Sequence, residues 1–99
     1  MAYVIFEMKA EDAGKINKLL TDDIVSRQSI AIRQANSLDL KGDCSYIKIE
    51  GSKEGLKKAE EIAKEAGFKK LAKKKAKVVD EKIKEQEDSA ASGIGMIFD

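Results

Sequence analysis

The apolar residues of this chain change their spacing along the sequence, and this change limits the folds that it can adopt. Residues 3–8 are mostly β-branched, aromatic or apolar, and apolar and polar residues alternate over 29–35 and 44–50, as in half-buried strands. Over 11–21 and 52–66 the apolar residues instead recur every third or fourth position, as on one face of a helix. The resulting order is strand, helix, strand, strand, helix.

This order predicts an α+β fold, a two-layer sandwich in which two helices cover one face of a mostly antiparallel sheet. It is the ferredoxin-like order β-α-β-β-α, with 94–98 as the candidate for a terminal strand. Because side chains alternate along a strand, we expect Val4 and Phe6 to face the helices. The opposite face, with Tyr3 and Tyr46, is expected to be open to solvent or to a partner.

Three residues predict where turns and helix ends fall. Gly42 is expected to adopt a positive φ in the polar turn between the second and third strands. Ser52 is suited to cap the N-terminus of the second helix, and Gly67 stands where a helix commonly ends in a left-handed residue. Gly14 lies inside the first helix and weakens it by about 1 kcal/mol relative to alanine.

The pattern divides the chain into an α+β core over 1–67, a lysine-rich helical extension over 68–88, and a final segment over 89–99. The final segment is predicted to be a loop that leads into an apolar strand or tail. Within the extension, apolar residues over 72–83 follow spacings of four and three, as in a short heptad-like seam. The seam and 94–98 are therefore predicted surfaces for self-association or for a protein partner.

Composition argues against the common catalytic chemistries. The chain contains no histidine and one cysteine, so Ser-His, Cys-His and zinc-hydrolase sites are excluded. The cysteine, Cys44, falls in an alternating strand, where we expect it to act as a small apolar side chain. We therefore predict that the protein is not an enzyme, and that it has no cofactor unless it binds Ca²⁺.

Whole-chain properties predict a small cytoplasmic protein. The 99 residues make one domain, and 19 basic residues nearly balance 18 acidic ones, which predicts no strong polyanion binding by net charge. No apolar run reaches the roughly 18–20 residues that cross a bilayer, and residues 1–6 lack the positive charge of a signal peptide. We therefore expect no membrane contact.

Acidic residues flank the first predicted helix and occupy the hairpin turn. Clustered carboxylates bind hard cations, so these residues predict a weak, exposed Ca²⁺ site. The alternative is surface charge that favours helix ends and solubility, since no EF-hand loop is present. The candidate metal residues are Glu11, Asp12, Asp22 and Asp23 around the helix, with Asp39 and Asp43 in the turn.

Lysines are concentrated just after the second helix. They predict a phosphate-contacting surface that binds nucleic acid without sequence preference and with strong salt dependence. The alternative is a solvated helix face, since two arginines and 5 % aromatic residues are too few for base readout or stacking. The candidate nucleic-acid residues are Lys69, Lys70, Lys73, Lys74, Lys75 and Lys77.

The segment YIKIEGSKEGLKKAEEI, at 46–62, resembles the closing strand and helix of KH RNA-binding domains. KH domains hold RNA with a G-x-x-G loop between two helices, and this chain contains no G-x-x-G. The resemblance therefore implies a strand followed by a helix, without the RNA-binding function.

The N-terminal two-thirds, notably EDAGKINKLLTDDIVSRQSI at 11–30, is similar to a group of small proteins from methanogenic archaea. The property associated with that group is calcium binding. The resemblance implies Ca²⁺ as the ligand of the acidic residues and leaves the lysine-rich extension outside the matched region.

Overall fold

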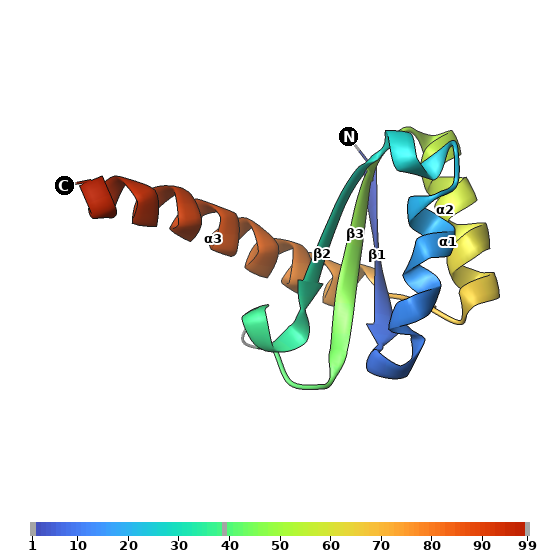
Figure 1. Ribbon diagram of the computed structural model, residues 1–99, viewed down its shortest axis with the longest axis horizontal. Coiled ribbons are helices and arrows are strands. Elements are labelled where there is room, and N and C mark those ends of the chain that lie inside the picture. Colours follow the sequence, from blue (N-terminus) through green and yellow to red (C-terminus); the bar gives the residue numbers. More distant parts are fainter. Residues whose placement is uncertain (1, 39, 99) are drawn as a thin grey trace.

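The computed structural model describes residues 2–38 and 40–98, and it describes side chains as far as residue 86. Four strands form one sheet in which all neighbours are antiparallel, in the order β2-β3-β1-β4. Figure 1 shows β2, β3 and β1 side by side in this order. The predicted α+β class with an antiparallel sheet is confirmed. The strands are β1 (Ala2–Lys9), β2 (Ser29–Gln34), β3 (Cys44–Gly51) and β4 (Lys69–Lys70).

Helical segments connect and cover the strands. Two of them, η1 and α1, follow β1 directly, η2 precedes β2, and η3 lies between β2 and β3. Helix α2 joins β3 to β4, and α3 follows β4. The 3₁₀ helices are η1 (Ala10–Ile16), η2 (Val25–Arg27) and η3 (Ala35–Leu38), and the α-helices are α1 (Asn17–Leu20), α2 (Lys53–Ala66) and α3 (Lys73–Phe98).

The first predicted helix, over 11–21, is the least regular element. It is present, but its first part is the 3₁₀ helix η1 and only its last part is α-helical. Its apolar stripe is partly used, since Leu19 is fully buried and Ile16 packs against the core while Leu20 is 37 % exposed. A short stripe and an interior glycine stabilise a full α-helix only weakly.

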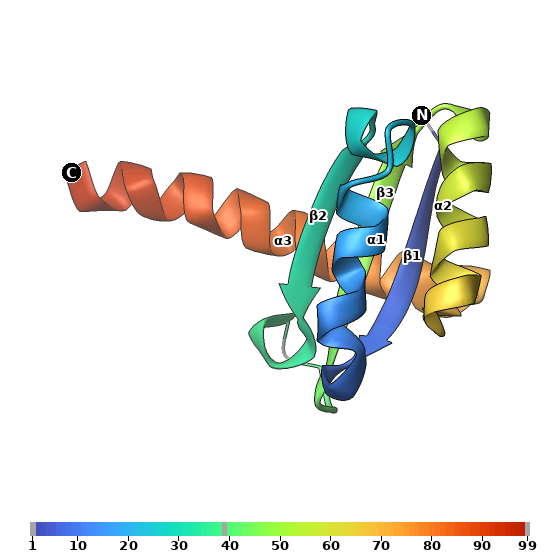
Figure 2. The same ribbon diagram turned by 45° about the vertical axis from the view of Figure 1, so that its right-hand side comes forward.

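One face of the sheet carries the first core cluster, as the strand pattern predicts. Side chains alternate along β1, so Val4, Phe6 and Met8 all point to this face. Figure 2 shows α1 and α2 lying in front of it. The cluster is completed by Leu19, Val25, Ile47, Ile49, Leu56, Ala59, Ala63, Ala66 and Phe68.

The ends of α2 lie where the sequence predicts them. The Ser52 hydroxyl accepts a hydrogen bond of 3.1 Å from the backbone N–H of Gly55, which caps the first turn. Gly67 ends the helix with φ 85°, and Gly42 has φ 121° in the connection between β2 and β3. All three predictions about turns and helix ends are confirmed.

The opposite face of the sheet is covered by α3, so the prediction of an open face is wrong. Helix α3 crosses behind the sheet in Figure 2 and packs Ala76, Val79 and Ile83 in a second core cluster with Ile5 and Tyr46. The sheet face opposite α1 and α2 and the predicted seam on α3 both carry apolar side chains, and packing them together removes both from water. The seam therefore packs on the sheet of its own chain.

Polar contacts also attach α3 to the sheet. The Gln86 side-chain oxygen accepts a hydrogen bond of 2.8 Å from Nε of Arg33 on β2, and its nitrogen donates one of 2.9 Å to the carbonyl of Ser37. Beyond this point α3 continues past the sheet (Figure 1), and the molecule measures 46 Å in its longest dimension.

The residues after α2 are part of the fold and not an extension of a core over 1–67. The helix predicted from Phe68 begins only at Lys73, because Phe68 enters the first core cluster and Lys69–Lys70 pairs with β1. Backbone pairing at the free edge of β1 satisfies hydrogen-bonding groups that a helix would leave exposed there. The predicted extension, 68–88, thus supplies both the fourth strand and the cover of the second face.

The fourth strand does not come from 94–98, and the loop predicted at the start of 89–99 is also wrong. Helix α3 includes these residues up to Phe98. Once a helix has formed, each added residue gains a hydrogen bond without a new nucleation cost, which favours continuation. The side chains of 94–98, a predicted partner surface, lie outside the described residues, as does Asp99.

Val79→Ala is expected to destabilise the protein, because it leaves a cavity under α3. Val79 is 0 % exposed, whereas its neighbour Val78 is 46 % exposed. Loss of two buried methyl groups should lower the free energy of unfolding by about 2 kcal/mol. Val78→Ala is the matched control and should change it by less than about 0.5 kcal/mol. Chemical denaturation measures both, and equal small effects would contradict the packing of α3 on the sheet.

Candidate functional site

Two of the acids predicted to bind a cation, Asp22 and Asp23, have other partners in the structure. One carboxylate oxygen of Asp22 accepts hydrogen bonds from the backbone N–H groups of Ile24 and Val25, each at 3.0 Å. This contact caps the turn that begins η2. The exposed carboxylate of Asp23 lies 4.0 Å from the guanidinium of Arg27, one helical turn away.

The remaining acids that the structure describes do not complete a metal site. Asp12 lies 3.3 Å from the ammonium of Lys15 in η1, and Glu11 precedes it on the same exposed segment. Within the described residues, no three Cys, Asp or Glu side chains come together in a way that could hold a metal ion. Asp39 lies outside the described residues. The structure thus offers no support for the predicted Ca²⁺ site, because these acids serve separate helix ends and turns.

The glycine-rich turn before α2 encloses a side chain of the same protein. The Gln28 side-chain oxygen accepts a 3.1 Å hydrogen bond from the backbone N–H of Ser52, and its nitrogen donates one to the Ile24 carbonyl at 3.1 Å. An added Cβ would lie 1.9 Å from Gln28 Oε1 at Gly51 and 2.3 Å from Gln28 Cδ at Gly55. The glycines therefore make room for Gln28, a contact between distant segments that the sequence analysis missed.

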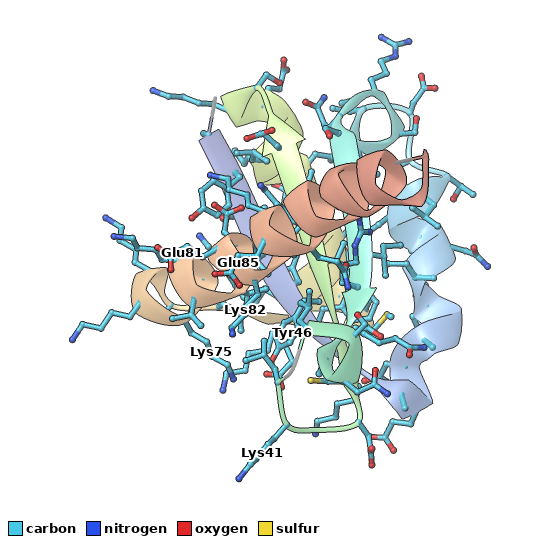
Figure 3. All side chains as sticks on the ribbon, turned by 90° about the vertical axis from the view of Figure 1, so that its left-hand side faces the viewer. Lys41, Tyr46, Lys75, Glu81, Lys82 and Glu85 are labelled. Carbon is cyan, nitrogen blue, oxygen red and sulfur yellow. The ribbon has the colours of Figure 1, made fainter. Side chains whose placement is uncertain are left out.

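The candidate lysines surround β4 and the first turns of α3, a surface that we call the lysine-rich end. All of them are exposed, and Figure 3 shows Lys75 extending away from the beginning of α3. Lys70 contacts the carboxylate of Glu60 on α2. Among the side chains that the structure describes, the other members form no ion pair. The lysine-rich end comprises Lys69, Lys70, Lys73, Lys74, Lys75 and Lys77.

Three of these lysines, Lys73, Lys74 and Lys75, lie where the helix dipole opposes their charge. They occupy the first turn of α3, which contains no acid. A helix N-terminus carries partial positive charge, so an acid there is stabilising by about 0.3–1 kcal/mol and a lysine is not. The arrangement is unfavourable for the isolated helix and favourable for the binding of an anion.

A groove of about 710 Å³ lies beside the lysine-rich end, between α3 and the N-terminal half of β1. Tyr3, Ile5, Leu71 and Ala76 contribute apolar surface to it. The sequence does not reveal this groove, because its walls come from two segments far apart in the chain. Its charged lining residues are Lys70, Lys73, Lys77, Asp80, Glu81 and Lys84.

Asp80 is a buried charge at this groove and links α3 to β3. It is 4 % exposed, the Lys48 ammonium contacts one of its oxygens, and the Lys84 ammonium lies 3.2 Å from the other. The Lys48 ammonium also lies 5.2 Å from the centre of the Tyr3 ring, a cation–π contact. Burial by itself would raise the pKa of the Asp80 carboxyl, but the hydrogen bonds and charges of both lysines lower it overall.

The position of Asp80 in the sequence indicates that it is a special charged residue. Asp80 follows Val79 and precedes Ile83 by three residues, so it lies on the apolar stripe of α3. A charged residue on a buried stripe requires a partner of opposite charge. The identity of that partner, Lys48, depends on which face of the sheet α3 covers.

Cys44 and Tyr46 of β3 pack with the second core cluster. Cys44 is a partly buried free thiol, in the apolar role predicted for it. Burial, together with the neighbouring Cys44 side chain, raises the pKa of Tyr46 to about 12. Its phenol therefore keeps its proton at neutral pH and is a poor general base.

Comparisons with protein-family models, with curated proteins and with solved structures found no match to this chain. In the part of the chain that the structure describes, no helix has both the length and the apolar content needed to span a membrane.

Asp80→Asn is expected to destabilise the protein, because it leaves the largely buried Lys48, whose side chain is 13 % exposed, without a full counter-charge. Breaking a buried ion pair lowers the free energy of unfolding by about 3 kcal/mol. Since the folded-state pKa of Asp80 is lowered, its ionised form stabilises the protein above the ordinary carboxyl range. That contribution is lost as the pH falls through this range toward the folded-state pKa.

Denaturation of both proteins across the acidic and neutral range checks this expectation. The stability difference between native protein and variant should be largest at neutral pH and should shrink in acid. Glu81→Gln is the matched control, since it removes a charge from the exposed adjacent residue and should have little effect. A difference that stays constant with pH would contradict the assigned role of Asp80.

Proposed function

We propose that the protein is a non-enzymatic binding module that recognises an anionic partner through the lysine-rich end. The observation that carries this proposal is the first turn of α3, where Lys73, Lys74 and Lys75 are exposed and form no ion pair with the described side chains. Their positive charge is unfavourable beside the helix N-terminus. A bound anion would compensate both the lysines and the dipole.

The absence of histidine from the sequence supports a non-enzymatic role. Ca²⁺ has no part in this proposal, because the carboxylate of Asp22 is used by backbone N–H groups and that of Asp23 lies beside Arg27. Binding is therefore assigned to positive rather than negative side chains.

Nucleic acid is one anionic polymer that would suit this surface, because exposed lysines contact phosphates without sequence preference. The aromatic side chains around it are poorly placed for stacking, since Phe68 and Tyr46 are 6 % and 2 % exposed and Tyr3 lies against Lys48. RNA or DNA would therefore be held by its backbone, with an affinity that falls steeply as salt is added.

We also propose that the sheet is of the ferredoxin-like type. Two β-α-β units, β1-α1-β2 and β3-α2-β4, interlock in the strand order β2-β3-β1-β4, which supports this assignment. The two-residue β4 and the cover provided by α3 are departures from the simplest form. Contacts between backbone amides in solution that indicate another strand order would overturn the assignment.

Charge reversal at Lys73, Lys74 and Lys75, each to Glu, tests the functional proposal. Binding of a mixed-sequence RNA oligomer and of polyglutamate, followed by fluorescence anisotropy over a salt series, should weaken roughly tenfold or more. The same variant should unfold at a higher temperature, because each new acid at the helix N-terminus stabilises α3 by about 0.3–1 kcal/mol. Loss of binding with a gain in stability separates function from folding.

The matched control reverses three exposed lysines on α2, Lys53, Lys57 and Lys64, and gives the same change in net charge. It should reduce binding much less, because α2 covers the other face of the sheet. Equal losses in the two variants would mean that net charge alone governs binding. No binding of either polyanion to the native protein at low salt would overturn the proposal.

A further inference from the structure

The strand edge of β1 next to β4 is paired along only part of its length. β4 pairs with Phe6 and Glu7, and the backbone N–H of Leu71 donates a hydrogen bond of 3.0 Å to the carbonyl of Ile5. After this contact the chain leaves the sheet and enters α3. Within the described residues, no strand continues this row beside the N-terminal part of β1.

The register identifies the backbone groups that are left at this edge. Because the Ile5 carbonyl points toward β4 and backbone groups alternate along a strand, Tyr3 presents its N–H and C=O on the same side. The side chains of Tyr3 and Ile5 both face α3, where they pack with the second core cluster. An added strand would pair with Tyr3 and continue the row begun by β4.

The groove provides the space for such a strand. Its volume of about 710 Å³ lies directly along this edge, with Ala2, Tyr3, Val4 and Ile5 on one side and α3 on the other. Apolar side chains of an extended peptide would contact Leu71 and Ala76 on the face toward α3. Backbone pairing would supply affinity, and the alternate side chains would supply specificity.

The charge around the groove selects the partner. Four lysines and two acids line it, and one of the acids, Asp80, is buried and already contacts Lys48 and Lys84. Lys73 and Lys77 form no ion pair with the described side chains, so the rim carries net positive charge and attracts a peptide of net negative charge, even where its acidic side chains lie on the strand face away from α3. A second copy of this chain would bring the same lysines together and is therefore disfavoured.

From this geometry we infer that the protein binds an extended acidic peptide, which adds as a strand to the free edge of β1 at Tyr3 with its apolar side chains in the groove against α3. The inference rests on the proposed function, because it names the class of anionic partner that the lysine-rich end serves. Nucleic acid would use the lysines without needing the strand edge.

A short capped peptide in which glutamate and valine alternate is the probe. Its binding is followed by ¹⁵N–¹H correlation spectra and amide hydrogen exchange of the full chain. The Tyr3 amide should become protected from exchange, and the amides of Ala2, Val4 and Ile5 should shift on titration. A peptide in which lysine replaces glutamate is the control and should bind at least roughly tenfold more weakly.

N-methylation of the peptide tests strand addition without altering the protein. Directly opposed residues of an antiparallel pair share one face, so a valine that faces α3 would be opposite Tyr3 and would direct its N–H at β1. Methylation of the valine nitrogens should therefore weaken binding roughly tenfold or more, whereas methylation of the glutamate nitrogens should have little effect.

Charge variants of the protein locate the binding surface. Lys73→Glu with Lys77→Glu should weaken binding of the glutamate–valine peptide, whereas Lys53→Glu with Lys57→Glu on α2 should not. Both pairs are exposed and change the net charge equally. Equal effects of the two pairs would overturn the placement of the peptide in the groove.

The other outcomes separate this inference from the proposed function. If methylation of the valine nitrogens and of the glutamate nitrogens weakens peptide binding equally, strand addition is overturned. RNA or polyglutamate binding at the lysine-rich end without binding of the glutamate–valine peptide would overturn the inference and leave the proposed function intact. If none of these anions binds, both the proposed function and the peptide inference are overturned. If the protein self-associates through Tyr3 in the absence of peptide, the free edge of β1 pairs with a second copy and the peptide inference is overturned.

Discussion

The packing of α3 on the sheet is the contact on which the rest of this structure depends. It removes Ile5 and Tyr46 from water on the face that α1 and α2 do not reach. It also creates the groove beside β1 and directs the lysines of its first turn into solvent. Without α3 the sheet would expose an apolar face, which soluble single domains avoid.

The buried contact between Asp80 and Lys48 has a different role from that of the apolar contacts. A buried ion pair adds little net stability compared with well-packed apolar residues, because both charges lose their hydration. Its effect is positional, since a shift of α3 along the sheet would separate Lys48 from Asp80 and leave the buried carboxylate with Lys84 of its own helix as its remaining partner. Apolar packing therefore attaches α3 to the sheet, whereas this pair specifies where along the sheet it lies.

The lysine-rich end departs from the local rules that the rest of the chain follows. Helix α2 has a serine cap, an acid in its first turn and a left-handed glycine at its end, all of which stabilise it. Helix α3 instead begins with Lys73, Lys74 and Lys75. Natural proteins depart from such rules mainly at functional sites, so the contrast between the two helices supports a binding role for this end.

The sequence by itself determined what depends on neighbouring residues: the alternation of Val4, Phe6 and Met8, the cap at Ser52 and the positive φ at Gly67. It also predicted that the lysines would be exposed, because such a dense run cannot be buried. Tertiary structure decided the cover of the second face, the strand at β4, the partner of Asp80 and the groove. Each of these joins segments far apart in the chain, and local periodicity specifies that a surface is apolar without specifying which surface will cover it.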